Sequence, residues 1–145
     1  MSFDNIRNNP NRCKHIVSGD QLEVDIANGQ LPHLMYYTPN IDNDGHNTGL
    51  IYANDWLSGW LPSKLNNAKF MKNTLIFITF DEDDYLFGNH IYAVAIGSMV
   101  EPGTVDHNTY NHFSLLRTIE DNFSLGTLGR NDAKANSFSC FTNKK

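Results

Sequence analysis

Three apolar runs along the chain have the length and residue content of β-strands. Residues 74–80 and 91–96 are nearly unbroken apolar runs that contain β-branched residues, and Gly97 closes the second. Such runs are typical of strands buried on both faces of a sheet, so the first predicts a central strand. The aromatic-rich run at 34–38, which stops at Pro39, predicts a further strand.

Other segments carry apolar residues at helical spacing. This pattern predicts helices over 50–65 and 109–123, the first ended or kinked at Pro62. A shorter helix is expected over 20–27, ended by the Asn-Gly pair that follows it. Because these helices alternate with the predicted strands, we expect an α/β fold in which helices pack against a sheet.

Length and composition set the limits of this fold. The 145 residues allow one domain of ordinary size, and we expect residues 1–145 to form it. Hydrophobic residues make up 40% and aromatic residues 12%, which is enough for a core and argues against wholesale disorder. No apolar run approaches the ~18 residues of a membrane span.

The net charge, the N-terminal residues and the cysteines bear on the binding partners and the cellular compartment of the protein. The formal net charge is −5, and lysine and arginine form no clustered stripe, so nucleic acid is not the expected partner. Residues 1–20 are polar and charged where a signal peptide would be apolar, so none is expected there. Cys13 and Cys140 leave two interpretations open: free thiols in a reducing compartment, or one bridge in an oxidising compartment.

The first of three polar clusters is Asp44-Gly45-His46. A carboxylate and an imidazole two residues apart in a tight turn can point at one site. The alternative is that Asp44 only caps the turn and His46 is solvated.

The second cluster, Asp81-Glu82, follows the predicted strand at 74–80. Ligands of open α/β sheets bind at the carboxyl ends of the strands, and carboxylates there can hold a divalent cation. The alternative is an acidic solvated loop, since Asp83 and Asp84 continue the run.

The third cluster, Tyr110-Asn111-His112, begins the predicted helix at 109–123. A helix N-terminus suits an anion such as phosphate, and a histidine there can bind metal, hold phosphate or protonate a leaving group. The alternative is a histidine in an exposed first turn.

Together the three clusters supply the groups that metal-assisted phosphoryl chemistry requires. The sequence contains no glycine-rich loop of the kind that binds nucleotides.

These residues belong to a series of motifs that resembles the C-terminal part of the phosphoesterase family. That family, in the alkaline phosphatase superfamily, includes fungal acid phosphatases and bacterial phospholipase C enzymes. The matching segments follow one another in order along nearly the whole chain: 2–13, 38–41, 43–46, 56–61, 73–76, 79–82, 110–120 and 125–132.

The resemblance implies a fold and a site. The fold is α/β, a partial alkaline-phosphatase-like sheet flanked by helices. Asp81 and Glu82 match the family's metal ligands, for a divalent ion of unspecified identity. Asp44 and His46 match the segment lining the phosphate or second-metal position, and His112 matches the late histidine that faces it. The implied reaction is hydrolysis of phosphate esters through a hydroxyl nucleophile.

The resemblance also implies partners and location. The expected ligand is a phosphate-ester small molecule or a phospholipid head group. Family members are often secreted, vacuolar or associated with the cell wall.

The chain departs from the family pattern in several places. Asn47 occupies the position after His46 where the family usually has aspartate. Directly before the late histidine, His112, the family has tyrosine but this chain has Asn111, and Tyr110 lies one position earlier. Residues 83–90 make a shorter loop than in many members. Family members exceed twice this length, and their first half, which carries the nucleophile, has no counterpart here. No serine or threonine lies in a nucleophile-like context, including Ser58, Ser98 and Ser114.

The departures leave alternatives open. One is an inactive pseudoenzyme or gene fragment that acts as a binding module, and another is a small interaction domain whose acidic loop is only solvated. An exposed sheet edge is also expected. The chain would then associate with itself or pair with a partner through this edge, or it would be only marginally stable.

Overall fold

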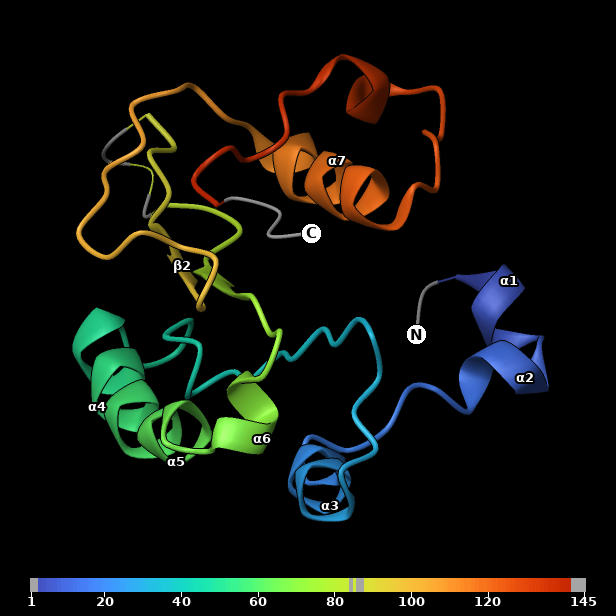
Figure 1. Cartoon of the computed structure of the whole chain (residues 1–145), viewed down its shortest axis with the longest axis vertical. Helices are drawn as coiled ribbons and strands as arrows, with labels where there is room; N and C mark the ends of the chain where they lie inside the picture. The colour runs from blue at the N-terminus through green and yellow to red at the C-terminus, as the bar shows by residue number, and fades with distance from the viewer. Residues whose placement is uncertain (1–2, 84, 86–87, 142–145) are drawn as a thin grey trace. The chain divides into compact units, whose positions relative to one another are not determined.

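The structure, a computed structural model, describes residues 3–83, 85 and 88–141. The chain divides into two compact units, Met1–Met71 and Lys72–Lys145, which we describe separately (Figure 1). Asp84 of the predicted acidic run lies outside the described residues.

The first unit is helical. Its helices are α1 (Asp4–Arg7), α2 (Pro10–Cys13), α3 (Gln21–Asn28), α4 (Leu50–Trp60), α5 (Pro62–Leu65) and α6 (Ala68–Met71). The break between α4 and α5 falls at Pro62, as predicted, because proline lacks the N–H that would continue α4. Helix α3 ends at Gly29, whose φ of 65° is the left-handed conformation that glycine adopts at little cost.

An aromatic and charged cluster holds the first unit together. The ring of Trp60 lies 5.4 Å from that of Trp56 and 4.7 Å from that of Tyr37, centroid to centroid. The Nζ of Lys64 lies 4.4 Å from the centre of the Trp60 ring and pairs with Glu23 of α3. The buried Lys64 stem thus joins α3 to the helices that follow it.

The strand predicted at 34–38 is not formed. These residues are exposed and lie outside any strand. Among the described residues, no backbone hydrogen bond involves them. A strand is defined by pairing with a neighbour, so strand-like sequence without such a neighbour remains irregular.

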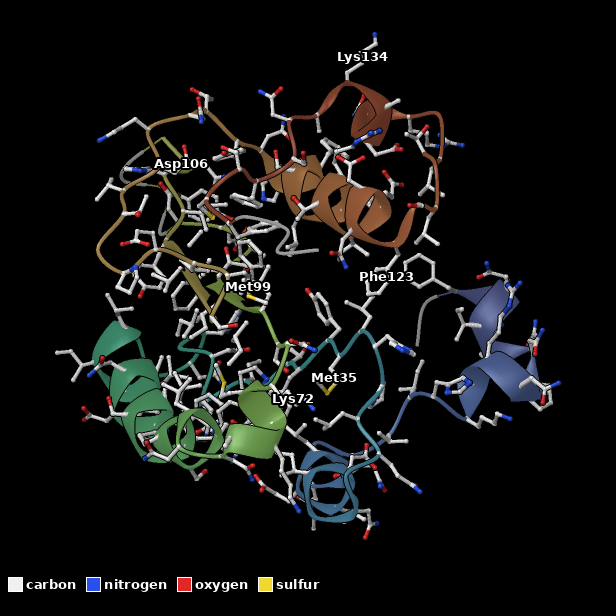
Figure 2. All side chains as sticks on the ribbon, viewed as in Figure 1. Met35, Lys72, Met99, Asp106, Phe123 and Lys134 are labelled. Carbon is white, nitrogen blue, oxygen red and sulfur yellow. The ribbon has the colours of Figure 1, made fainter. Side chains whose placement is uncertain are left out.

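The second unit contains a small sheet and one long helix. Strands β1 (Ile76–Thr79) and β2 (Ala93–Ile96) pair antiparallel, with Ile76 opposite Ile96 and Thr79 opposite Ala93. Within the described residues this sheet has two strands, which together with the helices gives a partial α/β fold. The prediction that β1 is buried on both faces is wrong, because its residues are half-buried or exposed. Met99 lies beside this sheet, as Figure 2 shows.

Helix α7 (His112–Phe123) is attached to the sheet through Phe138. The Phe138 ring lies 4.9 Å from that of Phe77 in β1 and 4.3 Å from that of Tyr110, just before α7. The Phe138 backbone N–H donates to the hydroxyl of Thr118 in α7 at 2.8 Å. This residue of the C-terminal segment therefore fixes α7 relative to β1.

The core is sparse. Among the described residues, the apolar ones that are buried are Ala53 and Phe70, and Glu120 carries a buried carboxylate oxygen without a hydrogen-bond partner. No described helix has the length and hydropathy needed to cross a membrane. Both cysteines are free thiols, and burial raises the pKa of Cys140.

Asp132 organises the loop after α7, at the short 3₁₀ helix η1 (Asn131–Lys134). Its carboxylate is 1% exposed and accepts hydrogen bonds from the backbone N–H of Leu128 at 2.7 Å and of Arg130 at 3.0 Å. Burial acts to raise the pKa of Asp132, but the backbone N–H donors outweigh it and hold this pKa below its ordinary value.

The low pKa of Asp132 predicts a pH dependence of stability. The folded-state pKa lies below the unfolded value of about 3.9, so the stabilisation is complete above that pH and is lost as pH falls through the folded pKa. We expect Asp132→Asn to unfold at lower urea than wild type at pH 6, and the gap to close as the pH falls through the lowered folded-state pKa of Asp132. Hydrogen exchange of α7 amides in urea measures this gap. A gap that is independent of pH would contradict the assignment.

Candidate active site

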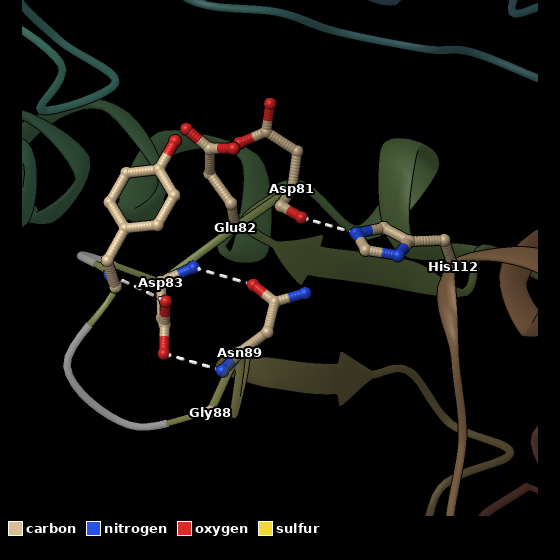
Figure 3. Close-up of a pocket in the computed structure, with 7 residues that line it drawn as sticks. Asp81, Glu82, Asp83, Gly88, Asn89 and His112 are labelled. Atoms are coloured by element: carbon tan, nitrogen blue, oxygen red, sulfur yellow. Dashed lines mark hydrogen bonds between the residues drawn. The ribbon is translucent and has the colours of Figure 1, made fainter.

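Asp81 and Glu82 lie where β1 ends and line a pocket of about 370 Å³. Figure 3 shows their carboxylates pointing toward one another. Both residues are exposed, so the pocket is open to solvent. The described residues that line it are Asp81, Glu82, Asp83, Tyr85, Gly88, Asn89 and His112.

His112 joins this pocket from the first position of α7. Its Nε2 lies 2.5 Å from the backbone carbonyl oxygen of Asp81 (Figure 3). A carbonyl oxygen only accepts, so Nε2 carries the proton and donates it. In the neutral imidazole, Nδ1 is then the bare nitrogen that can accept a proton or bind a ligand. The contact joins two residues 31 positions apart in the sequence.

The residues before α7 set where His112 lies. The Tyr110 hydroxyl donates to the Asp106 carboxylate at 2.6 Å, and this bond is the main reason that the pKa of Asp106 is lowered. The Asn111 side chain accepts from the N–H of Phe113, and the N–H of Asn111 in turn donates to the Ser114 hydroxyl oxygen. The Phe113 N–H is one of the groups at the helix N-terminus that the sequence analysis expected to be available to an anion. It instead donates within this capping box. Ser114 is fully buried here, in a capping role.

Asp83 and Asn89 close the loop beside the pocket. The Asp83 N–H donates to the Asn89 side-chain oxygen at 3.1 Å, and the Asn89 N–H donates to the Asp83 carboxylate at 2.7 Å. Asp83 also accepts from the N–H of Tyr85. Sequence reasoning missed these residues as parts of the site. The sequence feature that could have revealed Asp83 is the acidic run in which it lies. Asp83 closes this loop by hydrogen bonds and is not only a solvated charge.

Asp44 and His46 lie in the first unit, in a turn of their own. The Asp44 carboxylate accepts from the backbone N–H of His46 at 2.9 Å, and the His46 Nδ1 lies 3.2 Å from the side-chain oxygen of Asn47. Asp44 thus supports His46 through the backbone, not through the imidazole. The structure brings Asp81, Glu82 and His112 together in the second unit, while the roles of Asp44 and His46 stay predictions.

The charges of the pocket bear on which ligands it can take. The described lining residues include three carboxylates and neither lysine nor arginine. Among the described residues, no group of three or more His, Cys, Asp and Glu side chains is arranged to hold a metal ion. Carboxylates are nevertheless the ligands of Mg²⁺, which often takes one or two of them and fills its other positions with water and substrate phosphate. The donor chemistry of Asp81 and Glu82 fits such an ion.

A comparison with protein families identifies the chain. The model of the phosphoesterase family matches residues 2–126. The chain belongs to the phosphoesterase family. This confirms the resemblance found in the sequence motifs, and it places the pocket at Asp81 and Glu82 within a phosphoesterase-family chain.

Relatives of this phosphoesterase-family chain include phosphatases of fungi and of a bacterium. An acid phosphatase of Aspergillus niger is 38% identical over 98% of this chain and 35% of its own length. A probable acid phosphatase of Kluyveromyces lactis is 37% identical over 92% of the chain and 33% of its own length. A phosphatidylinositol-3-phosphatase of Mycobacterium tuberculosis is 36% identical over 68% of the chain and 32% of its own length. The chain thus spans about a third of these relatives. No solved structure gives a significant match.

Proposed function

We propose that this phosphoesterase chain takes part in the hydrolysis of phosphate esters, in a site to which it contributes Asp81, Glu82 and His112. The observation that carries the proposal is the pocket that joins the two strand-end carboxylates to the histidine of α7. Family membership and the named activities of the acid phosphatase relatives support it.

The charge of the pocket is the reason to propose a divalent cation. Three carboxylates without a lysine or arginine among the described lining residues repel a phosphate dianion. Asp81 and Glu82 would hold the cation, which neutralises phosphate oxygens when it is bound. The same residues therefore both require the ion and supply ligands for it.

His112 is proposed as the proton-transfer group. The Asp81 carbonyl holds the proton on Nε2, so the bare Nδ1 is the atom that accepts or returns a proton at a bound ester. By the family motif, His46 is proposed to contact phosphate or a second metal, and Asp44 to support His46. The hydroxyl nucleophile that the resemblance implies is assigned to no serine or threonine of this chain.

The substrate class is proposed from the relatives. The acid phosphatases support phosphate monoesters, and the phosphatidylinositol-3-phosphatase of M. tuberculosis extends the proposal to a phosphorylated lipid head group. The openness of the pocket to solvent fits a small ester or a head group.

Hydrolysis of p-nitrophenyl phosphate tests the proposal. We expect turnover that requires a divalent cation, stops on chelation and falls about 10²- to 10⁴-fold in His112→Ala, because a positioned proton donor or acceptor contributes about that much. His90→Ala is the matched control, since His90 is exposed and does not line the pocket. A folded protein without turnover in any divalent cation would contradict hydrolysis by this chain.

The second candidate is a non-catalytic module that binds phosphate esters. One observation favours it: among the described lining residues, the hydroxyl group is that of Tyr85, and no serine or threonine lines the pocket. Cation-dependent binding of p-nitrophenyl phosphate without its hydrolysis would support this candidate over the first.

A further inference from the structure

Tyr85 is an exposed residue that lines the same pocket as Asp81, Glu82 and His112. It is 86% exposed, so its ring is largely in contact with water. Among the described lining residues, this phenol ring is the large apolar side chain, and the others are acids, an amide, a glycine and a histidine. Ligand pockets commonly have aromatic side chains that cover the organic part of the ligand. The pocket thus combines charged groups with one aromatic surface.

The backbone of Tyr85 has a conformation that tyrosine rarely adopts. Its φ is 58°, in the left-handed region, which glycine and asparagine tolerate but a bulky side chain seldom enters. The Tyr85 N–H donates to the Asp83 carboxylate at 2.7 Å. Unfavourable backbone conformations persist where the surrounding structure fixes them, and they cluster at active sites and ligand clamps. The conformation therefore indicates that Tyr85 has a role in the pocket.

Asp83 and Asn89 fix this conformation. The Asp83 carboxylate accepts from the N–H of Asn89 as well as from that of Tyr85, and the Asn89 side chain accepts from the N–H of Asp83 (Figure 3). Asn89 also has a positive φ, of 60°. One carboxylate thus joins two left-handed positions, and all three residues line the pocket. The result is a tyrosine whose backbone is held in place while its ring has little protein to pack against.

The ring favours one chemical class of ligand. Two aromatic rings that stack gain more than the area they bury, whereas an aliphatic group of the same size gains only from burial. In the proposed function, Asp81, Glu82 and their cation take the phosphate of the ester. The part of the ester left to contact Tyr85 is then the alcohol from which the phosphate is removed.

We propose that Tyr85 is a specificity-determining residue, which stacks on the alcohol part of the substrate and makes the site prefer phosphate monoesters of aromatic alcohols. The inference rests on the proposed function, because that function places the phosphate at Asp81 and Glu82. It also narrows the substrate class. An aliphatic head group offers no aromatic ring, so small aryl esters are favoured over it.

Two phosphonates that cannot be hydrolysed test this preference. Benzylphosphonate and cyclohexylmethylphosphonate carry the same phosphonate group and differ in whether their six-membered ring is aromatic. In calorimetric titrations with Mn²⁺ present, we expect the dissociation constant of benzylphosphonate to be about 2- to 10-fold the lower one. Tyr85→Phe should keep this ratio because it keeps the ring, whereas Tyr85→Leu should bring the ratio to about 1.

Two controls accompany these variants. Tyr36→Leu should keep the wild-type ratio, because Tyr36 is 84% exposed, as Tyr85 nearly is, but does not line the pocket. Methylphosphonate has no ring to stack on Tyr85. Its affinity should therefore be the same in the wild type and in Tyr85→Leu, which shows that the variant is folded and retains the cation site.

The outcomes separate this inference from the proposed function. Equal affinities in the wild type, or a preference that survives in Tyr85→Leu, would overturn the role of Tyr85 and leave the phosphate site supported. If none of the three phosphonates binds with Mn²⁺ or Mg²⁺, the proposed function is wrong and the inference falls with it. A preference that is lost in Tyr85→Leu, in a protein that does not hydrolyse p-nitrophenyl phosphate, supports Tyr85 and contradicts hydrolysis.

Discussion

Asp81→Ala is expected to weaken divalent-cation binding at least about 100-fold and to abolish cation-dependent turnover. The physical reason is the loss of one of two carboxylates that point toward one another at the end of β1. Changes in residues that only orient a metal ligand cost about 10- to 100-fold in affinity, so loss of the ligand itself should cost at least as much. Calorimetric titration of Mn²⁺ into the wild type and the variant measures the difference.

Two features make this variant informative. The hydrogen bond from His112 goes to the backbone carbonyl of Asp81, so the substitution leaves the acceptor of His112 in place. Glu101→Ala is the matched control, because Glu101 is an exposed acid of the same unit that does not line the pocket. If both variants bind Mn²⁺ as the wild type does, the cation site proposed at Asp81 and Glu82 is wrong.

Gly97→Ala is expected to destabilise the second unit by about 1–3 kcal/mol, the usual cost of overpacking. A Cβ on Gly97 would lie 2.5 Å from the sulfur of Met99 and 2.7 Å from the carbonyl oxygen of Thr74. The methionine side chain can rotate away, but the carbonyl belongs to the backbone that leads into β1. Relief therefore requires the end of the sheet to shift. Amides of Ile76–Thr79 should exchange about 10- to 100-fold faster under conditions of global opening.

The matched control for this substitution is Gly59→Ala in α4. A Cβ there meets nothing within 4 Å, and alanine is the better helix former, so we expect stabilisation by about 0.5–1 kcal/mol. Both tryptophans, Trp56 and Trp60, lie in the first unit, so their fluorescence in urea reports this change. Equal exchange of the β1 amides in Gly97→Ala and the wild type would show that the sheet tolerates the methyl group.

Much of the helical structure could be predicted because its signals are local. The helix at 112–123 begins within the segment predicted from its apolar spacing, and its Asn111 cap bonds residues two and three positions away. The stop at Gly29 and the break at Pro62 likewise depend on the conformations open to one residue. Such interactions form in the chain segment itself, so the sequence alone is enough to place them.

Strands and their burial could be predicted less well. The apolar runs at 74–80 and 91–96 do contain β1 and β2, although the strands are shorter and β1 is only half-buried. The run at 34–38 is as strand-like in sequence but has no neighbour among the described residues. Residue propensity cannot specify a sheet partner, because that partner comes from elsewhere in the chain or from another chain.

The candidate site likewise has features that follow from local sequence and features that depend on tertiary contacts. The sequence by itself predicted which residues would carry the chemistry, namely the acids after β1 and the histidine that opens α7, because residue type and position at an element's end are local properties. Only the tertiary structure decided that His112 meets the backbone of Asp81 and that Asp83 closes a loop with Asn89. Contacts between residues 31 positions apart depend on packing, here that of Phe138 on Phe77 and Tyr110, which no local pattern encodes.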